Sequence, residues 1–567
     1  MPDRDALLAF EGQVDAAIQD SPLLRLPRRS VLTMIYLIIH QCFHGDLMGS
    51  ENGDPEVGAA IINRLSLVAH LLLRCPIEPF GADAGDAMSP FEVAPELTHE
   101  VIRLFTYGHF SELMPEVRRG YYEVHRLGPS NFELVHSNEL FTHFEEVDTL
   151  LSEVAIPFFA TMPEPSEELI ESAFQLDDVT DADSLIELYA AAFAHTYLTT
   201  HELPLLSDAG YQSIIGVSFD QFRRFQASWA AWTHVAYLAS ERFRRAIVEQ
   251  GGPDENRDLH TLWLEWIAVN FTKEFLESAC IPVSGLDVPT FRRLASLYTL
   301  SADSKPGDGF FPPLLRHRKS TFFNPDTLRT MLSGRNLVYA TLRGRENEFS
   351  AVAGNSLEPR LLADATTQLN HDPSLVIVQN CNWSSGSVAG EIDLLVYDRN
   401  DNVALHIQAK GTIPPHGAKL TRNLESQILG GLNQLARLRD LPLREKDRII
   451  GEAIQTEVAN VEVVDVLLAR SSFGTIKVWG EMGRVVACSL PVLAGATRKL
   501  LQASGRIPLS TFSEAVAQTI EDIRTDCHPQ WSTWTMELDG TGITIPLLNL
   551  DPKGVQCARL RLFPETV

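Results

Sequence analysis

Hydrophobic positions recur at helical spacing through the first 300 residues. Apolar side chains fall three and four positions apart within 31–39 and again within 61–72, and Pro and Gly separate such runs. The pattern predicts a mostly α-helical N-terminal half. The segment Ser301–Pro313 concentrates Gly, Pro, Ser and Asp, which predicts a domain boundary.

After this boundary the hydrophobic period becomes that of β-strands. Three β-rich runs separated by turn residues predict a meander over Leu375–Asn380, Glu391–Tyr397 and Val403–Ala409. The pattern then predicts a helix over 420–438, strands over 461–468 and 475–479, and a helix over 491–501. This order of elements is typical of an α/β domain whose sheet is covered on its faces.

The last 60 or so residues predict a small β-rich addition. A helix is expected from about Leu509, then a hairpin whose turn is Asp539–Gly540, then a strand over Ala558–Phe563. The expected fold class is therefore multidomain: a mostly α-helical N-terminal half, an α/β domain and this addition. The expected bounds are 1–300, 301–345, 346–505 and 506–567.

Composition places the chain among soluble globular proteins. Of its 567 residues 45% are hydrophobic and 21% are charged, and no apolar run approaches the roughly 20 residues of a membrane span. The N-terminus has acidic residues where an export signal would be basic, so a cytoplasmic protein is expected. Seven single cysteines without a CxxC pair indicate reduced thiols.

The formal net charge of -27 is concentrated in the front of the chain, because residues 1–340 hold 48 acidic and 25 basic side chains, a balance of -23. A partner protein for this acidic half is one interpretation of the charge. From 316 to 345, by contrast, seven basic residues accompany one acid. This strip is a candidate for contact with phosphates, although a solvated linker explains the same composition. The candidate nucleic-acid contacts are Arg316, Arg318, Lys319, Arg343 and Arg345.

The predicted meander brings together side chains that suit phosphodiester chemistry. Side chains alternate along a strand, so Glu391 and Asp393 share one face, as do His406, Gln408 and Lys410 on the next strand. If the two strands form a hairpin, Asp393 lies beside Gln408 and Lys410. His406 is a further candidate for phosphate contact or for internal packing.

A phosphodiesterase needs oxygen ligands for Mg²⁺ and a cation beside the attacking water. Asp393 would be the principal ligand, with the Gln408 side-chain carbonyl and the Ala409 main-chain carbonyl as neutral companions. Lys410 would position the water and stabilise charge on the phosphate.

The phrase GEID, a turn, and a strand ending in QAK resemble the core motif of the PD-(D/E)XK nucleases. Glutamine in the second acidic position resembles the Mrr-type restriction endonuclease branch. The family carries a Glu on the preceding helix, and here Glu358, four residues after Gly354, matches it, with Glu348 as a competitor. An ordinary acidic helix start is the alternative for Glu358. The resemblance covers roughly 150 of the 567 residues.

This resemblance implies a metal-dependent DNA endonuclease that uses Mg²⁺, with Mn²⁺ as a substitute, in restriction or defence against phage. Because Gln408 removes one negative charge from the metal shell, Glu358 or Glu391 would have to compensate. The N-terminal half would then serve recognition, regulation or assembly. Cutting both strands commonly uses two active sites, which suggests a homo-oligomer, but no assembly signature in the sequence supports one.

Two other functions stay open from the sequence. A catalytically silent nuclease fold would bind nucleic acid or a partner protein as a scaffold, and a structure-specific nuclease would act in repair or recombination. The chain has no GxxxxGK[ST] loop, GxSxG elbow or HExxH helix, so ATP hydrolysis by the chain itself is not expected. The run His40–Cys42–His44 lacks further zinc ligands nearby, which favours core or surface histidines.

Overall fold

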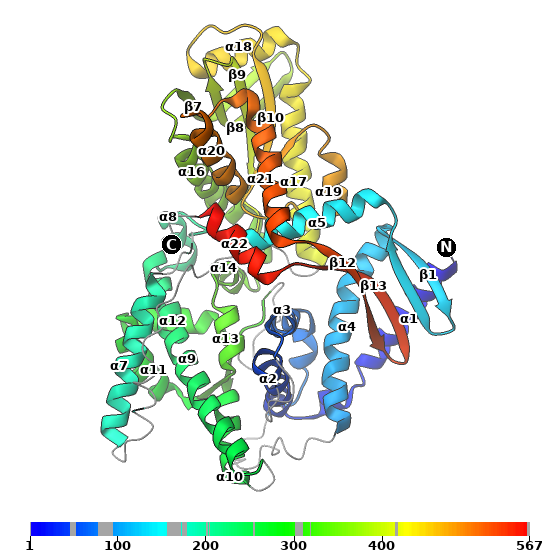
Figure 1. Cartoon of the computed structure of the whole chain (residues 1–567), viewed down its shortest axis with the longest axis vertical. Helices are drawn as coiled ribbons and strands as arrows, with labels where there is room; N and C mark the ends of the chain where they lie inside the picture. The colour runs from blue at the N-terminus through cyan, green and yellow to red at the C-terminus, as the bar shows by residue number, and fades with distance from the viewer. Residues whose placement is uncertain are drawn as a thin grey trace.

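The computed structural model describes residues 2–45, 53–77, 95–155, 172, 179–199, 202, 204–252, 256–300, 310–317, 319–413 and 418–563. The first nine residues of the predicted boundary, 301–309, and the candidate Arg318 lie outside this description. In Figure 1 an α/β unit stands above a broad helical region. No helix in the described part of the chain has the length and apolar character needed to cross a membrane.

The N-terminal half is helical, as its hydrophobic spacing predicts. The longest helix, α9, begins with a capping box in which Ser218 and Gln221 exchange side chain–backbone hydrogen bonds. The helices are α1 (Pro2–Ile18), α2 (Arg28–His44), α3 (Pro55–Leu72), α4 (Pro95–Arg119), α5 (Glu139–Val154), α7 (Val179–Leu198), α8 (Asp208–Gly210), α9 (Phe219–Glu249), α10 (Arg257–Ile267), α11 (Lys273–Ser284) and α12 (Val288–Leu297).

The residues after the predicted boundary fold into this helical region. They supply strands of a sheet ordered β3-β6-β5-β4 and two helices that enter the same hydrophobic core as α2 and α9. The described residues of 310–345 therefore belong to packed structure and do not form a solvated linker. Its elements and their partners are β3 (Val269–Thr272), β4 (Thr299–Leu300), β5 (Leu314–His317), β6 (Ser320–Phe323), α13 (Pro325–Met331) and α14 (Gly334–Leu342).

A five-stranded sheet, ordered β11-β10-β9-β8-β7, forms the centre of the α/β unit. Strands β7, β8 and β9 make the predicted antiparallel meander, while β9, β10 and β11 run parallel. Helix α17 packs on β8, β9 and β10, α18 on β7, and α16 on β9 and α20. The elements are α15 (Phe349–Val352), α16 (Glu358–Leu369), β7 (Leu375–Ser385), β8 (Val388–Asp398), β9 (Val403–Lys410), α17 (Ala418–Arg439), α18 (Leu443–Ile454), β10 (Glu462–Ala469), α19 (Ile476–Glu481), β11 (Val486–Ser489) and α20 (Leu490–Ser504).

Two predicted strands are wrong, because both segments are helical. Residues 475–479 fall largely in α19, and the strand after α19 is β11. The predicted C-terminal strand 558–563 lies mostly within α22 (Pro552–Leu562), whose first turn is capped by the Asp551 carboxylate accepting from the backbone of Lys553 and Gly554.

The predicted helix and hairpin of the tail are confirmed as α21 (Phe512–Cys527), β12 (Gln530–Leu538) and β13 (Thr541–Asn549). The turn residues Asp539 and Gly540 both have positive φ, of 49° and 73°, as a tight two-residue hairpin requires. This hairpin does not stand alone. It joins β1 (Tyr122–Gly128) and β2 (Asn131–His136) in a sheet ordered β1-β2-β13-β12.

Helix α5 makes a second connection between the ends of the chain. It packs on α19, α21 and α22, and Figure 1 shows it beside α22 at the base of the α/β unit. Its buried side chains Val147, Leu150, Leu151 and Val154 belong to the same core as β8, β9 and α20. A segment from the N-terminal half therefore completes the core of the α/β unit.

Candidate active site

Strands β8 and β9 separate at the point where the predicted site residues lie. Their antiparallel pairs run from Asp398–Val403 to Leu394–Ile407 and end there, while β9 continues to pair with β10 as far as Lys410. Beyond this point two contacts from side chains to the backbone join the strands. The Ala409 N–H donates to Asp393 Oδ2 at 2.8 Å, and Gln408 Nε2 donates to the Glu391 carbonyl at 2.6 Å.

The side chain of Gln408 is fully buried, and only half of its amide is satisfied. Its Nε2 group is held by Glu391, whereas its Oε1 atom has no hydrogen-bond partner among the described residues. A buried carbonyl oxygen without a donor costs roughly 1–3 kcal/mol. A cation bound at this oxygen would remove that cost.

Lys410 lies at the end of β9 with its charged group directed at the start of α16. Its Nζ is 4.0 Å from Glu358 Oε1, and the same oxygen accepts from the Gly411 N–H at 3.3 Å. The lysine stem is packed, since a Cβ added at Gly431 of α17 would come within 2.8 Å of Lys410 Cε. The ammonium group therefore has a defined position.

A π-helical turn, Ala353–Leu357, positions Glu358 as the first residue of α16. The end of β9 crosses this turn closely: a Cβ on Gly411 would lie 2.7 Å from Leu357 Cβ and 2.9 Å from the Glu358 backbone nitrogen. Glycine is required here by the close approach. The competing acid, Glu348, instead pairs with Arg345 at 3.3 Å.

The acids of the site influence one another. Burial raises the pKa of Asp393 to about 6; the charges of Glu358 and Glu391 raise it too, while the Lys410 ammonium and the Ala409 N–H lower it. Burial also raises the pKa of Glu358, opposed mainly by Lys410. With three acids and one ammonium, the site has an excess of negative charge that a cation would offset.

These carboxylates are nevertheless spread out. Among the described residues, the one group of three or more His, Cys, Asp or Glu side chains whose ligand atoms all lie within 4.8 Å of one another is elsewhere, at His40, His44 and Asp326. A cation beside Asp393 would therefore have to take amide, backbone and water oxygens as well. Mg²⁺ usually retains several waters, which suits such a set.

His406, by contrast, has no surface for contact with phosphate. Its side chain is fully buried, and its Nδ1 lies 2.9 Å from Asp465 Oδ1 on the neighbouring strand β10. The expectation of a phosphate contact is corrected here: strand β9 is covered on both faces, so His406 is part of the interior.

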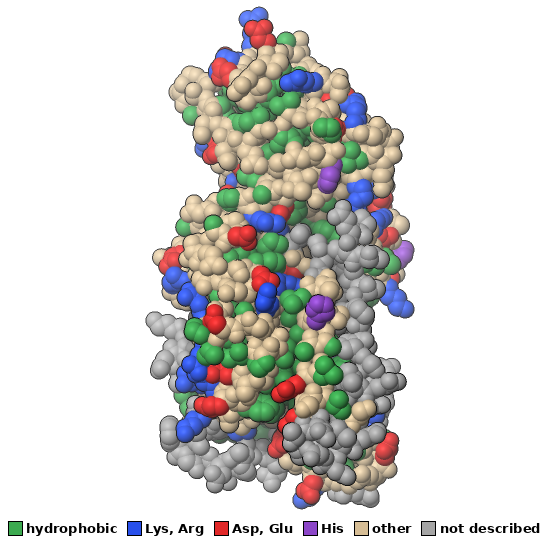
Figure 2. Space-filling model, turned by 90° about the vertical axis from the view of Figure 1, so that its left-hand side faces the viewer, with side chains coloured by type: hydrophobic (Ala, Val, Ile, Leu, Met, Phe, Trp, Pro, Cys, Tyr) green, Lys and Arg blue, Asp and Glu red, His purple; other side chains and the backbone are tan. Residues whose placement is uncertain are grey.

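Three of the described basic candidates share a cavity with other basic residues, and the fourth, Arg345, pairs with Glu348 at 3.3 Å. Arg316, Lys319 and Arg343 line one cavity of about 690 Å³ with Lys273 and Arg292. On the face drawn in Figure 2, Lys and Arg side chains alternate with Asp and Glu and form no continuous basic strip.

No family model, no curated protein and no solved structure matches this chain.

Proposed function

We propose that the chain is a metal-dependent DNA endonuclease of the PD-(D/E)XK type, acting in restriction or defence against phage. The observation that carries the proposal is the end of β8–β9 pairing, where the Asp393 carboxylate accepts from Ala409, the Gln408 oxygen has no partner among the described residues and the Lys410 ammonium lies 4.0 Å from Glu358. The order of α16, the meander, α17, β10 and α20 supports it, because the resemblance implies those elements in that order.

The residues fit a hard divalent cation. Asp393 Oδ1, Gln408 Oε1 and the Ala409 carbonyl would hold Mg²⁺ or Mn²⁺, with Glu358 and Glu391 adding negative charge nearby. When bound, the ion would polarise the phosphate and lower the pKa of a coordinated water. The Lys410 ammonium group, positioned by the packing of its stem and by Glu358, would orient the attacking water and stabilise the charge that develops on the phosphate.

The neutral Gln408 favours a second candidate, a catalytically silent scaffold that keeps this fold to bind nucleic acid or a partner protein. A carboxylate at that position would bind Mg²⁺ more strongly. A structure-specific repair or recombination nuclease would use the same residues and differ only in its substrate.

Cleavage of supercoiled, linear and branched DNA with Mg²⁺ or Mn²⁺ tests the proposal. We expect metal-dependent nicking that falls by at least about 100-fold in Lys410→Ala, the usual effect of removing a group that stabilises transition-state charge. Lys477→Ala, which changes an exposed lysine on α19, is the matched control and should cleave normally.

Absence of metal-dependent cleavage of any DNA, or unchanged cleavage in Lys410→Ala, would overturn the proposal. DNA binding without cleavage would support the silent scaffold. Cleavage restricted to branched DNA would support the repair or recombination enzyme.

A further inference from the structure

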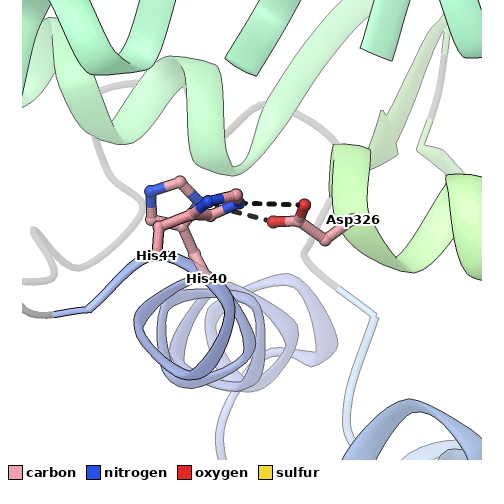
Figure 3. Close-up of side chains that lie close together, drawn as sticks. All are labelled: His40, His44 and Asp326. Atoms are coloured by element: carbon pink, nitrogen blue, oxygen red, sulfur yellow. Dashed lines mark hydrogen bonds and ion pairs between the residues drawn. The ribbon is translucent and has the colours of Figure 1, made fainter. Parts of the chain in front are cut away.

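Two histidines and one aspartate meet far from the candidate active site. His40 and His44 are one turn apart on α2, and Asp326 lies in the first turn of α13, 286 and 282 residues further along the chain. Figure 3 shows both imidazole rings directed at the two oxygens of the Asp326 carboxylate. His40 Nδ1 is 3.4 Å from Asp326 Oδ2, and His44 Nε2 is 3.1 Å from Oδ1.

These separations fit ligands around a single metal ion. Ligand atoms about 2.0–2.2 Å from a tetrahedral zinc ion lie roughly 3.3–3.5 Å from one another. The two observed distances, which end on different oxygens of Asp326, lie close to that range, and one ligand atom from each of the three residues lies within 4.8 Å of the other two.

Hydrogen bonds leave the two ring nitrogens of His40 poorly satisfied. The 3.4 Å contact is long for a hydrogen bond, and the other ring nitrogen, Nε2, is buried without a partner among the described residues.

The surroundings hold the two rings in place. The Tyr237 ring lies 4.8 Å from that of His44, and Trp263 meets His40 edge to face at 5.8 Å. The nearby charges are Arg329, 4.0 Å from the Asp326 carboxylate, and Glu241, which pairs with Arg244. Asp326 is buried, whereas the side chain of His44 remains 17% exposed and leaves a route for an ion.

We propose that His40, His44 and Asp326 bind one divalent transition-metal ion and thereby connect α2 to α13. Two imidazoles and one carboxylate favour zinc, iron, cobalt or nickel over magnesium, which prefers oxygen ligands. Three protein ligands leave at least one coordination position for water. Zn²⁺ is the occupant for which the test is designed, and the site is independent of the Mg²⁺ site proposed at Asp393.

The test is a Zn²⁺ titration of chelator-treated full-length protein against a chromophoric chelator, with Co²⁺ absorption as a second measurement. We expect one tight site and a visible Co²⁺ spectrum. Affinity should fall by more than about 100-fold in His44→Ala and in the near-isosteric Asp326→Asn, because changes outside the ligand set alone cost 10–100-fold. Circular dichroism identifies any variant that fails to fold; Asp326→Asn then carries the test.

Two controls separate this site from other metal binding. His371→Gln removes an exposed histidine whose Nδ1 lies 3.0 Å from the Gln368 carbonyl oxygen, and it should bind Zn²⁺ as the wild type does. Asp393→Asn should also retain the tight site. No stoichiometric Zn²⁺ binding, binding unchanged in a folded Asp326→Asn protein, or binding lost in Asp393→Asn would overturn the proposal.

Discussion

Replacing Asp148 by Asn is expected to stabilise the protein at neutral pH and to leave its stability unchanged in acid. Asp148 lies on α5 and holds the loop before α19. Its Oδ1 atom accepts from the backbone N–H groups of Phe473 at 2.7 Å and Gly474 at 3.2 Å, and from Trp479 Nε1 at 3.1 Å. The Asn side-chain oxygen can accept all three of these hydrogen bonds, but it carries no buried charge.

The size and sign of the effect follow from the pKa of Asp148. Burial raises that pKa from 3.8 to about 6, although the three donors lower it. The folded protein therefore favours the protonated carboxyl group, and its contribution to stability is fully present below about pH 3.8. The contribution is lost as the pH rises through 6, by roughly 3 kcal/mol in total at about 1.36 kcal/mol per pKa unit.

Urea unfolding followed by tryptophan fluorescence between pH 4 and pH 8 measures this difference. The gain of Asp148→Asn over the wild type should be small at pH 4 and should level off above pH 6. Asp148→Ala is the contrasting variant, since it leaves the three donors, of which Phe473 is buried and Gly474 and Trp479 are half-buried, without an acceptor, at up to about 1–3 kcal/mol each. A gain that does not change with pH, or an Asn variant less stable than the wild type at pH 7, would refute the reasoning.

Three further predictions concern the site and the thiols. Gly411→Ala should destabilise the fold by about 1–3 kcal/mol in urea unfolding and reduce DNA nicking, because the new Cβ would overlap Leu357; wild-type stability would contradict this. Gln408→Glu should lower nicking and not raise it, since a carboxylate oxygen would replace the amide that donates to the Glu391 carbonyl; a more active variant would show that charge outweighs this bond. A thiol reagent should label Cys557, the exposed cysteine, fastest in the native protein, and Cys557→Ser should remove that fast phase.

The elements that the sequence predicted correctly are those with local signals. The meander is marked by β-rich runs between turn residues, and the hairpin by Asp539–Gly540, which can take the positive φ values that its turn needs. The strands that carry Asp393, Gln408 and Lys410 were also predicted to be neighbours, and they pair from Asp398–Val403 to Leu394–Ile407. Pairing of neighbouring strands is itself a short-range feature.

The wrong strands and the unpredicted meeting of His40, His44 and Asp326 have a different origin. The segments 475–479 and 558–563 are short apolar runs, for which the strand and helix patterns are hard to distinguish. The helical spacing of His40 and His44 was visible in the sequence, but their third partner, Asp326, is 282 residues beyond His44, and no local pattern relates them. Contacts of this kind are set by tertiary packing.

The domain bounds drawn from the sequence assumed that each unit is a continuous stretch of chain. In the structure, α5 from the N-terminal half completes the α/β unit, and β13 of the C-terminal hairpin pairs with β2. Helix α5 buries Val147, Leu150 and Leu151 in the core of that unit. Its Asp148 carboxylate accepts a hydrogen bond from the backbone of the loop before α19. The α/β unit is thus attached to the helical region at several points distant in sequence.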